Sequence, residues 1–265
     1  MHLVSLSDLS ATDIRAIWAG AGAPVRPMQG TVGWSFEGNG VRTRTTFIQA
    51  FRELGLAHTE LPNLLKTQER VSDLAGYLDP FYTLYVVRES NHQRLAEFAA
   101  ASRRPVVNAM SSAGHPCEVL ADAHAIESRL GPLHRLRIGL WGPPTNVLRS
   151  WHELASVLEL TLLHFCPDEF HADQKHVRFS AQVDAPVDVL ITDGWPNGFT
   201  DTHWSLTHDH MARLGQPRLL PTPPFTIGNE LAFDPVTSAQ FMGYEQKLAL
   251  VSVQRAVLLH LLGSR

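Results

Sequence analysis

The sequence predicts an α/β protein of two domains, each built on a central parallel sheet covered by helices. Short apolar or β-branched runs, typical of buried strands, alternate along the chain with segments whose apolar residues recur at helical spacing. At 265 residues the chain is long enough for two such domains, each with its own core. A turn-rich segment at residues 130–134 separates a helical segment from a new strand, so we expect the domains to divide near residue 131.

Six runs are predicted strands. They cover residues 32–36, 82–87, 105–108, 137–141, 160–165 and 187–192. The spacing of apolar residues predicts helices around residues 9–18, 47–54 and 119–126. The closing segment, residues 237–262, is apolar at helical spacing and contains no Pro, so it is predicted to form one long helix packed on the fold.

The charge and the cysteine content narrow the possible partners. A net charge of -4 gives no general field that would attract nucleic acid or acidic lipid, so any anion must be held by locally placed cations. Cys117 and Cys166 are too few for a disulfide framework and lack metal-site spacing, so we expect free thiols, no metal and no cofactor. Residues 1–11 lack signal-peptide features, and no stretch approaches the roughly 20 apolar residues of a membrane span. The expected location is cytoplasmic, without nucleic-acid or membrane partners.

The strongest chemical signal is a strand, a Gly-containing turn and a helix start at residues 36–47. A helix start presents unpaired backbone N–H groups and the positive end of the dipole, and Arg42 and Arg44 add guanidinium groups suited to phosphate or carboxylate. Because cations there oppose the helix dipole, they need a compensating reason. The favoured interpretation is an anion site, and the alternative is that both arginines are simply solvated.

Three further polar side chains follow predicted strands, where open α/β sheets bind ligands. Arg88 follows the strand at 82–87, and Asp193 follows the strand at 187–192. His115 lies in a small-residue loop between a strand and a helix. Taken singly, each has a structural alternative: Arg88 as a surface residue, His115 as a satisfied side chain, and Asp193 as the cap of a turn.

Four motifs carry a family resemblance when they are taken in order. Residues 36–44 read Phe-Glu-Gly-Asn-Gly-Val-Arg-Thr-Arg, and residues 115–118 read His-Pro-Cys-Glu. Asn146 is followed by Val147, and residues 192–195 read Thr-Asp-Gly-Trp. These segments resemble the aspartate and ornithine carbamoyltransferase family, whose phosphate motif is Phe-Glu-x-x-Ser-Thr-Arg-Thr-Arg and whose later motifs include His-Pro-Cys-Gln. The last two segments are similar to motifs of the ornithine branch.

The resemblance, which covers nearly the whole chain, implies a carbamoyltransferase-like fold and function. Residues 1–131, closed by a helix at 237–265, would bind carbamoyl phosphate, and residues 132–236 would bind the acceptor. The implied enzyme moves a carbamoyl or closely related group from a phosphate-activated donor to the amino group of an amino-acid-like acceptor, without a cofactor. The resemblance also implies a homotrimer with active sites at subunit contacts, in which Lys66 would lie in a loop lent to a neighbour.

Site residues follow from the resemblance position by position. The phosphate-activated donor would be bound by Gly40, Val41, Arg42, Thr43, Arg88 and His115. As catalytic residues, His115 would polarise the carbonyl group, Arg88 would contact both phosphate and carbonyl, and Glu118 stands at the family's Gln. The acceptor would be oriented by Asn146, Asp193 and Asn197.

Several family residues are replaced in this chain. Gly40 and Val41 stand at the Ser-Thr pair of the phosphate motif, which removes two hydroxyl donors. Glu118, when ionised, only accepts hydrogen bonds and would favour a donor group richer in N–H or more positive. Ile227 stands where the family has an arginine, and the stretch 168–186 is shorter than usual.

Two functions remain open on these grounds. The favoured one is an active transferase with a modified donor or acceptor. The alternative is a catalytically inactive, carbamoyltransferase-like binding or regulatory protein that kept the fold. An unrelated nucleotide-binding α/β protein is disfavoured, because no Gly-x-Gly-x-x-Gly follows a strand and no Gly-Lys-Ser/Thr phosphate loop is present.

Overall fold

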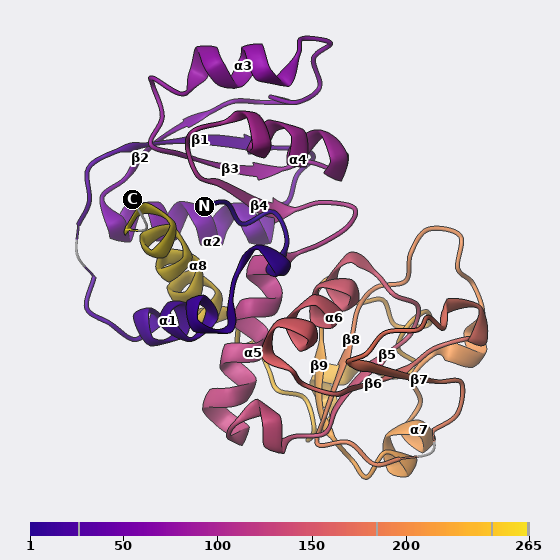
Figure 1. The fold of residues 1–265 in the computed structure, drawn as a ribbon. Coiled ribbons are helices and arrows are strands. Elements are labelled where there is room, and N and C mark those ends of the chain that lie inside the picture. The colour runs from indigo at the N-terminus through magenta and orange to yellow at the C-terminus, as the bar shows by residue number, and fades with distance from the viewer. Residues whose placement is uncertain (26, 184, 245, 264–265) are drawn as a thin grey trace. The chain divides into compact units, whose positions relative to one another are not determined.

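The predicted α/β class with two parallel sheets is confirmed. The computed structural model describes residues 1–25, 27–183, 185–244 and 246–263. The chain forms two compact units (Figure 1), Met1–His124 with Lys247–Arg265, and Ala125–Gln246. One boundary therefore falls inside helix α5 (Pro116–Leu130) and not in the turn near residue 131 where we expected it.

The first unit is built on a four-stranded sheet in the order β2-β1-β3-β4, with all strands parallel. Its helices and strands are α1 (Ala11–Ala21), β1 (Thr31–Phe36), α2 (Val41–Leu54), β2 (Ala57–Glu60), α3 (Val71–Leu78), β3 (Leu84–Arg88), α4 (His92–Ala101), β4 (Val106–Met110), the first part of α5, and α8 (Gln246–Gly263).

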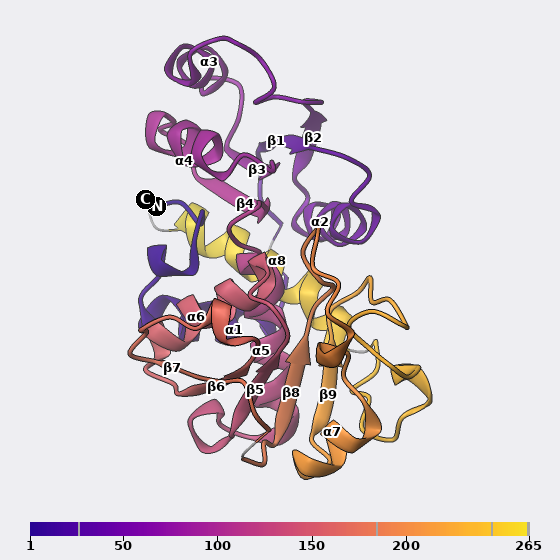
Figure 2. The same cartoon turned by 90° about the vertical axis from the view of Figure 1, so that its right-hand side faces the viewer.

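Both faces of this sheet are covered, as expected for parallel strands. On one face, Trp34 of β1 packs its ring against Phe47 and Phe51 of α2, with centroids 5.7 and 5.3 Å apart. On the other face, α3 and α4 pack on β3, where Phe98 meets the ring of Tyr85 edge-on at 5.1 Å. The two views agree that α2 and the α3–α4 pair lie on opposite sides of the strands (Figures 1 and 2).

The second unit is built on a five-stranded parallel sheet in the order β7-β6-β5-β8-β9, which Figure 2 shows side by side. Its elements are the end of α5, β5 (Ile138–Trp141), α6 (Asn146–Leu158), β6 (Leu162–Phe165), β7 (Val177–Ser180), β8 (Val189–Thr192), α7 (His208–Arg213) and β9 (Arg218–Pro221). Short 3-10 helices cover Leu6–Asp8 in the first unit and Leu133–Arg135, Asp168–Phe170, Thr202–Trp204 and Pro235–Thr237 in the second.

Three strands, β2, β7 and β9, were not predicted. Strand β2 is exposed at all four positions, and strand β7 lies at a sheet edge with one fully buried residue, so neither shows a continuous apolar run. Strand β9 begins with an exposed Arg and ends in Pro, which shortens its apolar run to two leucines. The other six strands could be predicted from their apolar runs, because nearly all of their residues are buried.

The prediction of a single helix over residues 237–265 was wrong at its start. Helix α8 begins at Gln246, and the chain before it includes a 3-10 turn at Pro235–Thr237. Phe241 forms a bridge with Leu219 of β9, so apolar residues in this stretch are buried against the sheet and not on a helix. Residues 245 and 264–265 of the predicted helix lie outside the described residues.

Candidate functional site

The carboxyl ends of β1, β3 and β4 bring the predicted donor residues to one edge of the first sheet. The three strands are neighbours, and Phe36 pairs in register with Arg88. The backbone N–H of Glu37 donates to the carbonyl of Arg88 at 3.0 Å, and that of Glu89 donates to the carbonyl of Met110 at 3.1 Å. The loops that leave these strands are therefore held together by the sheet itself, and they carry the remaining donor residues.

Helix α2 begins at this edge with a glycine in a left-handed conformation. Gly40 is the N-cap, with φ 42° and ψ 35° and no side-chain cap. The first intrahelical bond runs from the N–H of Arg44 to the carbonyl of Gly40 at 2.9 Å. Helix geometry leaves the N–H groups of Val41, Arg42 and Thr43 without intrahelical acceptors, which is the arrangement that binds anions.

Arg42 and Arg44 have different surroundings, which sequence reasoning did not separate. Arg44 pairs with Glu60 of β2, and its guanidinium lies over the Phe36 ring at 5.1 Å. Arg42 is exposed at the helix start. The carboxylate of Glu60 therefore compensates the positive charge of Arg44, which opposes the helix dipole. Arg42 is the arginine at this helix start that is available to an anion. Thr43, by contrast, is almost fully buried, so its contribution there would be its backbone N–H.

Arg88 is the last residue of β3 and lies beside the helix start. Its guanidinium is 5.6 Å from the centroid of the Phe36 ring. A Cβ built on Gly40 would come within 3.1 Å of Arg88 Nη1, so the two residues are in direct proximity. Burial, followed by the positive charge of Arg42, lowers the pKa of Arg88. Two guanidinium groups this close to one another favour an anion between or beside them.

His115 and Glu118 occupy the start of α5, next to this cationic region. His115 is 6% exposed, and burial lowers its pKa to about 4, so its imidazole is neutral near pH 7. Its Nε2 lies 4.0 Å from Oε2 of Glu118. The charge of Arg88 acts on His115 and that of Arg42 acts on Glu118, so the structure brings these four predicted residues together.

Lys247 of α8 is a site residue that the sequence analysis missed. Its ammonium group forms ion pairs with Glu118 and, at 3.2 Å, with Oδ1 of Asp122. Burial opposes ionisation of Glu118, but Lys247 and then His115 outweigh it and lower the pKa of this carboxyl. A signal was present: Glu118 and Asp122 are two acids one turn apart on a helix that is otherwise mostly buried, and such acids need a cation.

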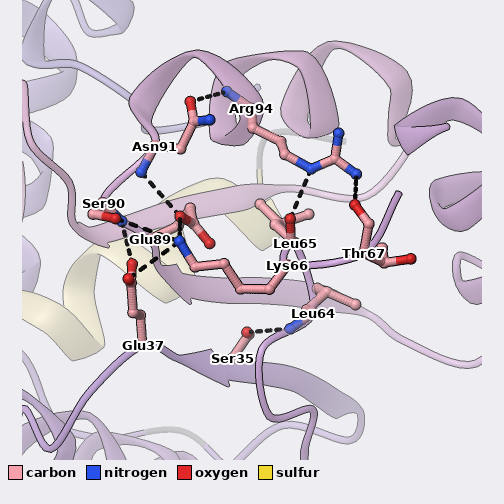
Figure 3. Close-up of polar contacts among 10 residues, drawn as sticks. All are labelled: Ser35, Glu37, Leu64, Leu65, Lys66, Thr67, Glu89, Ser90, Asn91 and Arg94. Carbon is pink, nitrogen blue, oxygen red and sulfur yellow. Dashed lines mark hydrogen bonds and ion pairs between the residues drawn. The ribbon is translucent and has the colours of Figure 1, made fainter. Parts of the chain in front are cut away.

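Lys66 joins the ends of β1 and β3 from the loop that follows β2. Its Nζ lies 2.5 Å from Oε1 of Glu89 and 3.1 Å from Oε1 of Glu37 (Figure 3). The N–H of Ser90, and after it Lys66, lower the pKa of Glu37 to about 2. The ammonium group is therefore engaged by two carboxylates of its own chain.

Arg94 of α4 fixes the same loop from the other side. Its Nε donates to the carbonyl of Leu65 and its Nη2 donates to the carbonyl of Thr67, both at 2.7 Å (Figure 3). The same Nη2 also donates to the carbonyl of Glu69 at 2.8 Å. The loop is therefore tied to α4 through Arg94 and to the ends of β1 and β3 through Lys66.

The predicted acceptor residues lie in the second unit. Asn146 is the first residue of α6, which follows β5, and Asp193 directly follows β8. Since β5 and β8 are adjacent parallel strands, both residues lie at the carboxyl edge of this sheet. Asn197 lies four residues after Asp193 in an exposed loop. Ile227, at the position of the family's arginine, is 55% exposed.

A buried histidine pair lies near this edge without being among the predicted site residues. His152 Nε2 is 2.9 Å from Nδ1 of His164, whose Nε2 is 2.8 Å from the carbonyl oxygen of Gly142. A carbonyl only accepts, so His164 donates through Nε2 and accepts from His152 through Nδ1. Burial lowers the pKa of His152 to about 3 and that of His164 to about 4, which keeps both neutral.

The histidines predict a loss of stability in mild acid. Because His115, His152 and His164 have folded-state pKa values below the 6.5 of the unfolded chain, the unfolded state binds protons that the folded state does not. Stability is complete above about pH 6.5 and should fall by roughly 1 kcal/mol per pH unit per histidine below it. Urea unfolding at a series of pH values measures this slope.

Two variants test the assignment of that slope. His152→Gln removes one titrating group, so the slope below about pH 6.5 should become shallower. His134→Ala is the control, because His134 is exposed and its removal should leave the slope unchanged. Equal slopes in all three proteins would contradict the assignment.

The described residues hold no cluster for a metal and no membrane-spanning helix. Among them, no group of three or more His, Cys, Asp and Glu side chains could hold a metal ion. No helix in the described ranges is both long and apolar enough to cross a membrane. Cys117 and Cys166 are buried free thiols, and burial raises the pKa of both.

The chain is thus a two-unit α/β protein with parallel sheets, and in its first unit guanidinium groups gather at a helix start and a strand end, an arrangement suited to an anion. Residues 1–128 match the family model described as aspartate/ornithine carbamoyltransferase, carbamoyl-P binding domain. Nearly half of the chain thus matches the carbamoyl-phosphate-binding domain of this family, and the chain is similar to the ornithine branch as a carbamoyltransferase-like transferase.

Individual relatives agree with this placement. The chain is 28% identical over 221 residues to an ornithine carbamoyltransferase of Bradyrhizobium diazoefficiens, covering 73% of this chain and 72% of the relative. It is 31% identical over 184 residues to one of Syntrophus aciditrophicus, covering 64% and 61%. The crystal structure of ornithine carbamoyltransferase from Burkholderia thailandensis shares the fold, with a TM-score of 0.88, 22% identity and 98% of both chains covered.

Proposed function

We propose that the chain transfers a carbamoyl or closely related group from a phosphate-activated donor to the amino group of an amino-acid-like acceptor. The observation that carries the proposal is the convergence of the α2 start, Arg42, Arg88 and His115 at one edge of the first sheet. No covalent nucleophile is needed, because this chemistry requires positioning and stabilisation of charge.

The donor phosphate would bind at the start of α2. The N–H groups of Val41, Arg42 and Thr43 point out of the helix end, and the guanidinium groups of Arg42 and Arg88 supply the positive charge. Gly40 and Val41 lack the two hydroxyl groups of the Ser-Thr pair in the resembled motif, and no other side chain supplies them. The backbone N–H donors and both arginines of the motif remain. Phosphate recognition would rest on charge and on the helix end.

The transfer itself would proceed by attack of the acceptor's amino nitrogen on the donor carbonyl carbon. A C–N bond forms, the bond from that carbon to the phosphate oxygen breaks, the electron pair leaves with phosphate, and the proton that the nitrogen gives up is taken by the leaving phosphate. Negative charge develops on the carbonyl oxygen, which neutral His115 would stabilise through an Nε2–H bond and Arg88 through its guanidinium. Charge on the leaving phosphate would be stabilised by Arg42.

The acceptor would be oriented by Asn146, Asp193 and Asn197 of the second unit. Asp193 can pair with an ammonium group, and Asn146 and Asn197 can bond both donors and acceptors of an amino acid. The position of Asn146 and Asp193 at one sheet edge supports a shared role.

A calorimetric titration with carbamoyl phosphate tests the donor site. The unaltered chain is expected to bind, and Arg42→Ala is expected to weaken binding by roughly 10- to 100-fold, the worth of a charge-assisted hydrogen bond. Arg44→Ala is the matched control two residues along the same helix, because Arg44 is held by Glu60 and should change binding only slightly.

The outcomes of this titration separate the functions. No binding by the unaltered chain would contradict the proposal. Binding without turnover on any amino acid in a panel would instead support a binding or regulatory protein. Equal losses in Arg42→Ala and Arg44→Ala would place the anion elsewhere.

Assembly and location are part of the proposal through the family resemblance. We expect a homotrimer acting in the cytoplasm. Sedimentation equilibrium of the purified chain, whose protomer mass is 29.4 kDa, measures the assembly directly. A monomer or dimer at micromolar concentration would contradict the trimer.

A further inference from the structure

We propose that Lys247 is a positioning residue of the donor site that holds Glu118 as an anionic hydrogen-bond acceptor beside His115. In this position the carboxylate selects a donor that carries an N–H group next to its carbonyl oxygen. The inference rests on the proposed function. It adds that the protein recognises the donor by the N–H group next to its carbonyl oxygen.

The contacts of Lys247 explain how the carboxylate is held. Its ammonium group pairs with Oε1 of Glu118 and with Oδ1 of Asp122, at 3.2 Å in the second case. The two acidic side chains are 9% and 1% exposed, so neither can exchange this partner for bulk water. Because Glu118 and Asp122 lie one turn apart on α5, one ammonium group reaches both and fixes the orientation of Glu118.

The other carboxylate oxygen is directed at the carbonyl-binding group. Oε2 of Glu118 lies 4.0 Å from Nε2 of His115, which is too far for a hydrogen bond between them. A neutral imidazole N–H and a carboxylate oxygen side by side form a donor and acceptor pair. That pair complements the carbonyl oxygen and the N–H on one edge of a carbamoyl group.

A donor without the N–H would leave this carboxylate unsatisfied. Acetyl phosphate has the same shape as carbamoyl phosphate but carries a methyl group in place of the amino group. With that methyl group against it, the buried carboxylate of Glu118 would be shielded from water and would receive no hydrogen bond. Sites that hydrogen-bond an N–H group strongly reject analogues that lack it. An ionised Glu118 therefore makes the site selective in a way that a neutral side chain would not.

Lys247 controls whether Glu118 is ionised. The charged or titratable groups that face this carboxyl are His115, which directly precedes α5, Cys117 and Asp122 of α5, Arg42 of α2, and Lys247 of α8. Burial alone raises the pKa of a carboxyl, and the opposing charge of Lys247 is the largest influence that lowers it. Without Lys247, Glu118 would take up a proton as the pH falls and would become a hydrogen-bond donor as well.

The experiment compares three ligands on four proteins by calorimetry. The ligands are carbamoyl phosphate, acetyl phosphate and inorganic phosphate. The proteins are the unaltered chain, Lys247→Met, Lys247→Arg and Arg255→Met. Arg255 lies on the same helix and pairs with Glu53, so its variant reports the effect of losing an α8 ion pair away from the donor site.

The unaltered chain is expected to prefer carbamoyl over acetyl phosphate by roughly 100-fold or more, with no change between about pH 6 and pH 8. In Lys247→Met the preference should fall to about 10-fold or less near pH 6 and recover as the pH rises, because ionisation of Glu118 returns. Binding of inorganic phosphate should stay within about threefold in every variant, and Lys247→Arg and Arg255→Met should keep the full preference.

Two results would overturn the inference, and they can be told apart. If Lys247→Met keeps the full preference at every pH while the unaltered chain binds carbamoyl phosphate, Lys247 has no positioning role and the proposed function stands. If the unaltered chain binds inorganic phosphate but not carbamoyl phosphate, the proposed function fails and the inference fails with it.

Discussion

His115→Ala is expected to lower kcat by about 10²- to 10³-fold, because it removes one hydrogen-bond donor from the oxygen on which charge develops. His115 is 6% exposed at the start of α5, beside Arg88 and Glu118. Steady-state kinetics with the best acceptor of a panel measures the effect. Inorganic phosphate binding should remain, since phosphate contacts the helix start and not the imidazole.

The pH dependence of the same reaction gives an independent check on His115. Burial holds the pKa of His115 near about 4, so the rate of the unaltered chain should show no change from this group between about pH 6 and pH 9. The rate should fall only as the pH approaches 4, when the imidazole takes up a proton. An inflection near pH 6.5 that is lost in His115→Ala would show that the histidine is not buried in the working enzyme.

Arg88→Met is expected to remove turnover by about 10³-fold or more and to weaken donor binding as well. Arg88 would contact both the phosphate and the carbonyl oxygen, so its loss affects the ground state and the transition state together. Arg88→Lys should recover part of the loss, because an ammonium group keeps the charge but lacks the planar pair of donors. The ratio kcat/KM for the donor measures both variants.

The control for Arg88 is an arginine whose ion pair has no contact with the site. Arg70 pairs with Asp73 on the surface, and its side chain is 80% exposed. Arg70→Met should leave kcat/KM unchanged, as surface ion pairs contribute little. An Arg88→Met variant that retained most of its activity would contradict both the donor site and the proposed reaction.

The closeness of Arg42, Arg88 and His115 could be predicted from the sequence, because each lies at or after the end of a buried strand. Strand ends of a parallel sheet meet at one edge, so local pattern was enough to bring these residues together. Lys247 could not be placed in this way, since its pairing with Glu118 depends on where α8 docks. The different environments of Arg42 and Arg44 could not be predicted either. Arg44 pairs with Glu60, and Glu60 belongs to β2, a strand without an apolar pattern in the sequence.

The division of the chain was predicted only approximately for a related reason. The turn at residue 131 is real, since α5 ends at Leu130 and Gly131 has a φ of 100°. The units divide earlier, after His124, because the two halves of one continuous helix pack on different cores. A turn-rich segment in the sequence shows where a helix ends. It does not show against which of the two hydrophobic cores each turn of that helix packs.

The glycine at the start of α2 limits which residues the first turn can carry. Gly40 has a φ of 42°, and a Cβ there would lie 2.4 Å from Cε1 of Phe36. That ring has Arg44 and Arg88 packed on it, so it cannot easily move aside. A side chain at residue 40, including the hydroxyl of the resembled motif, would therefore require the backbone, the ring and two arginines to change together. The packing around Phe36 thus makes residue 40 a position that tolerates no side chain unless its neighbours are rearranged.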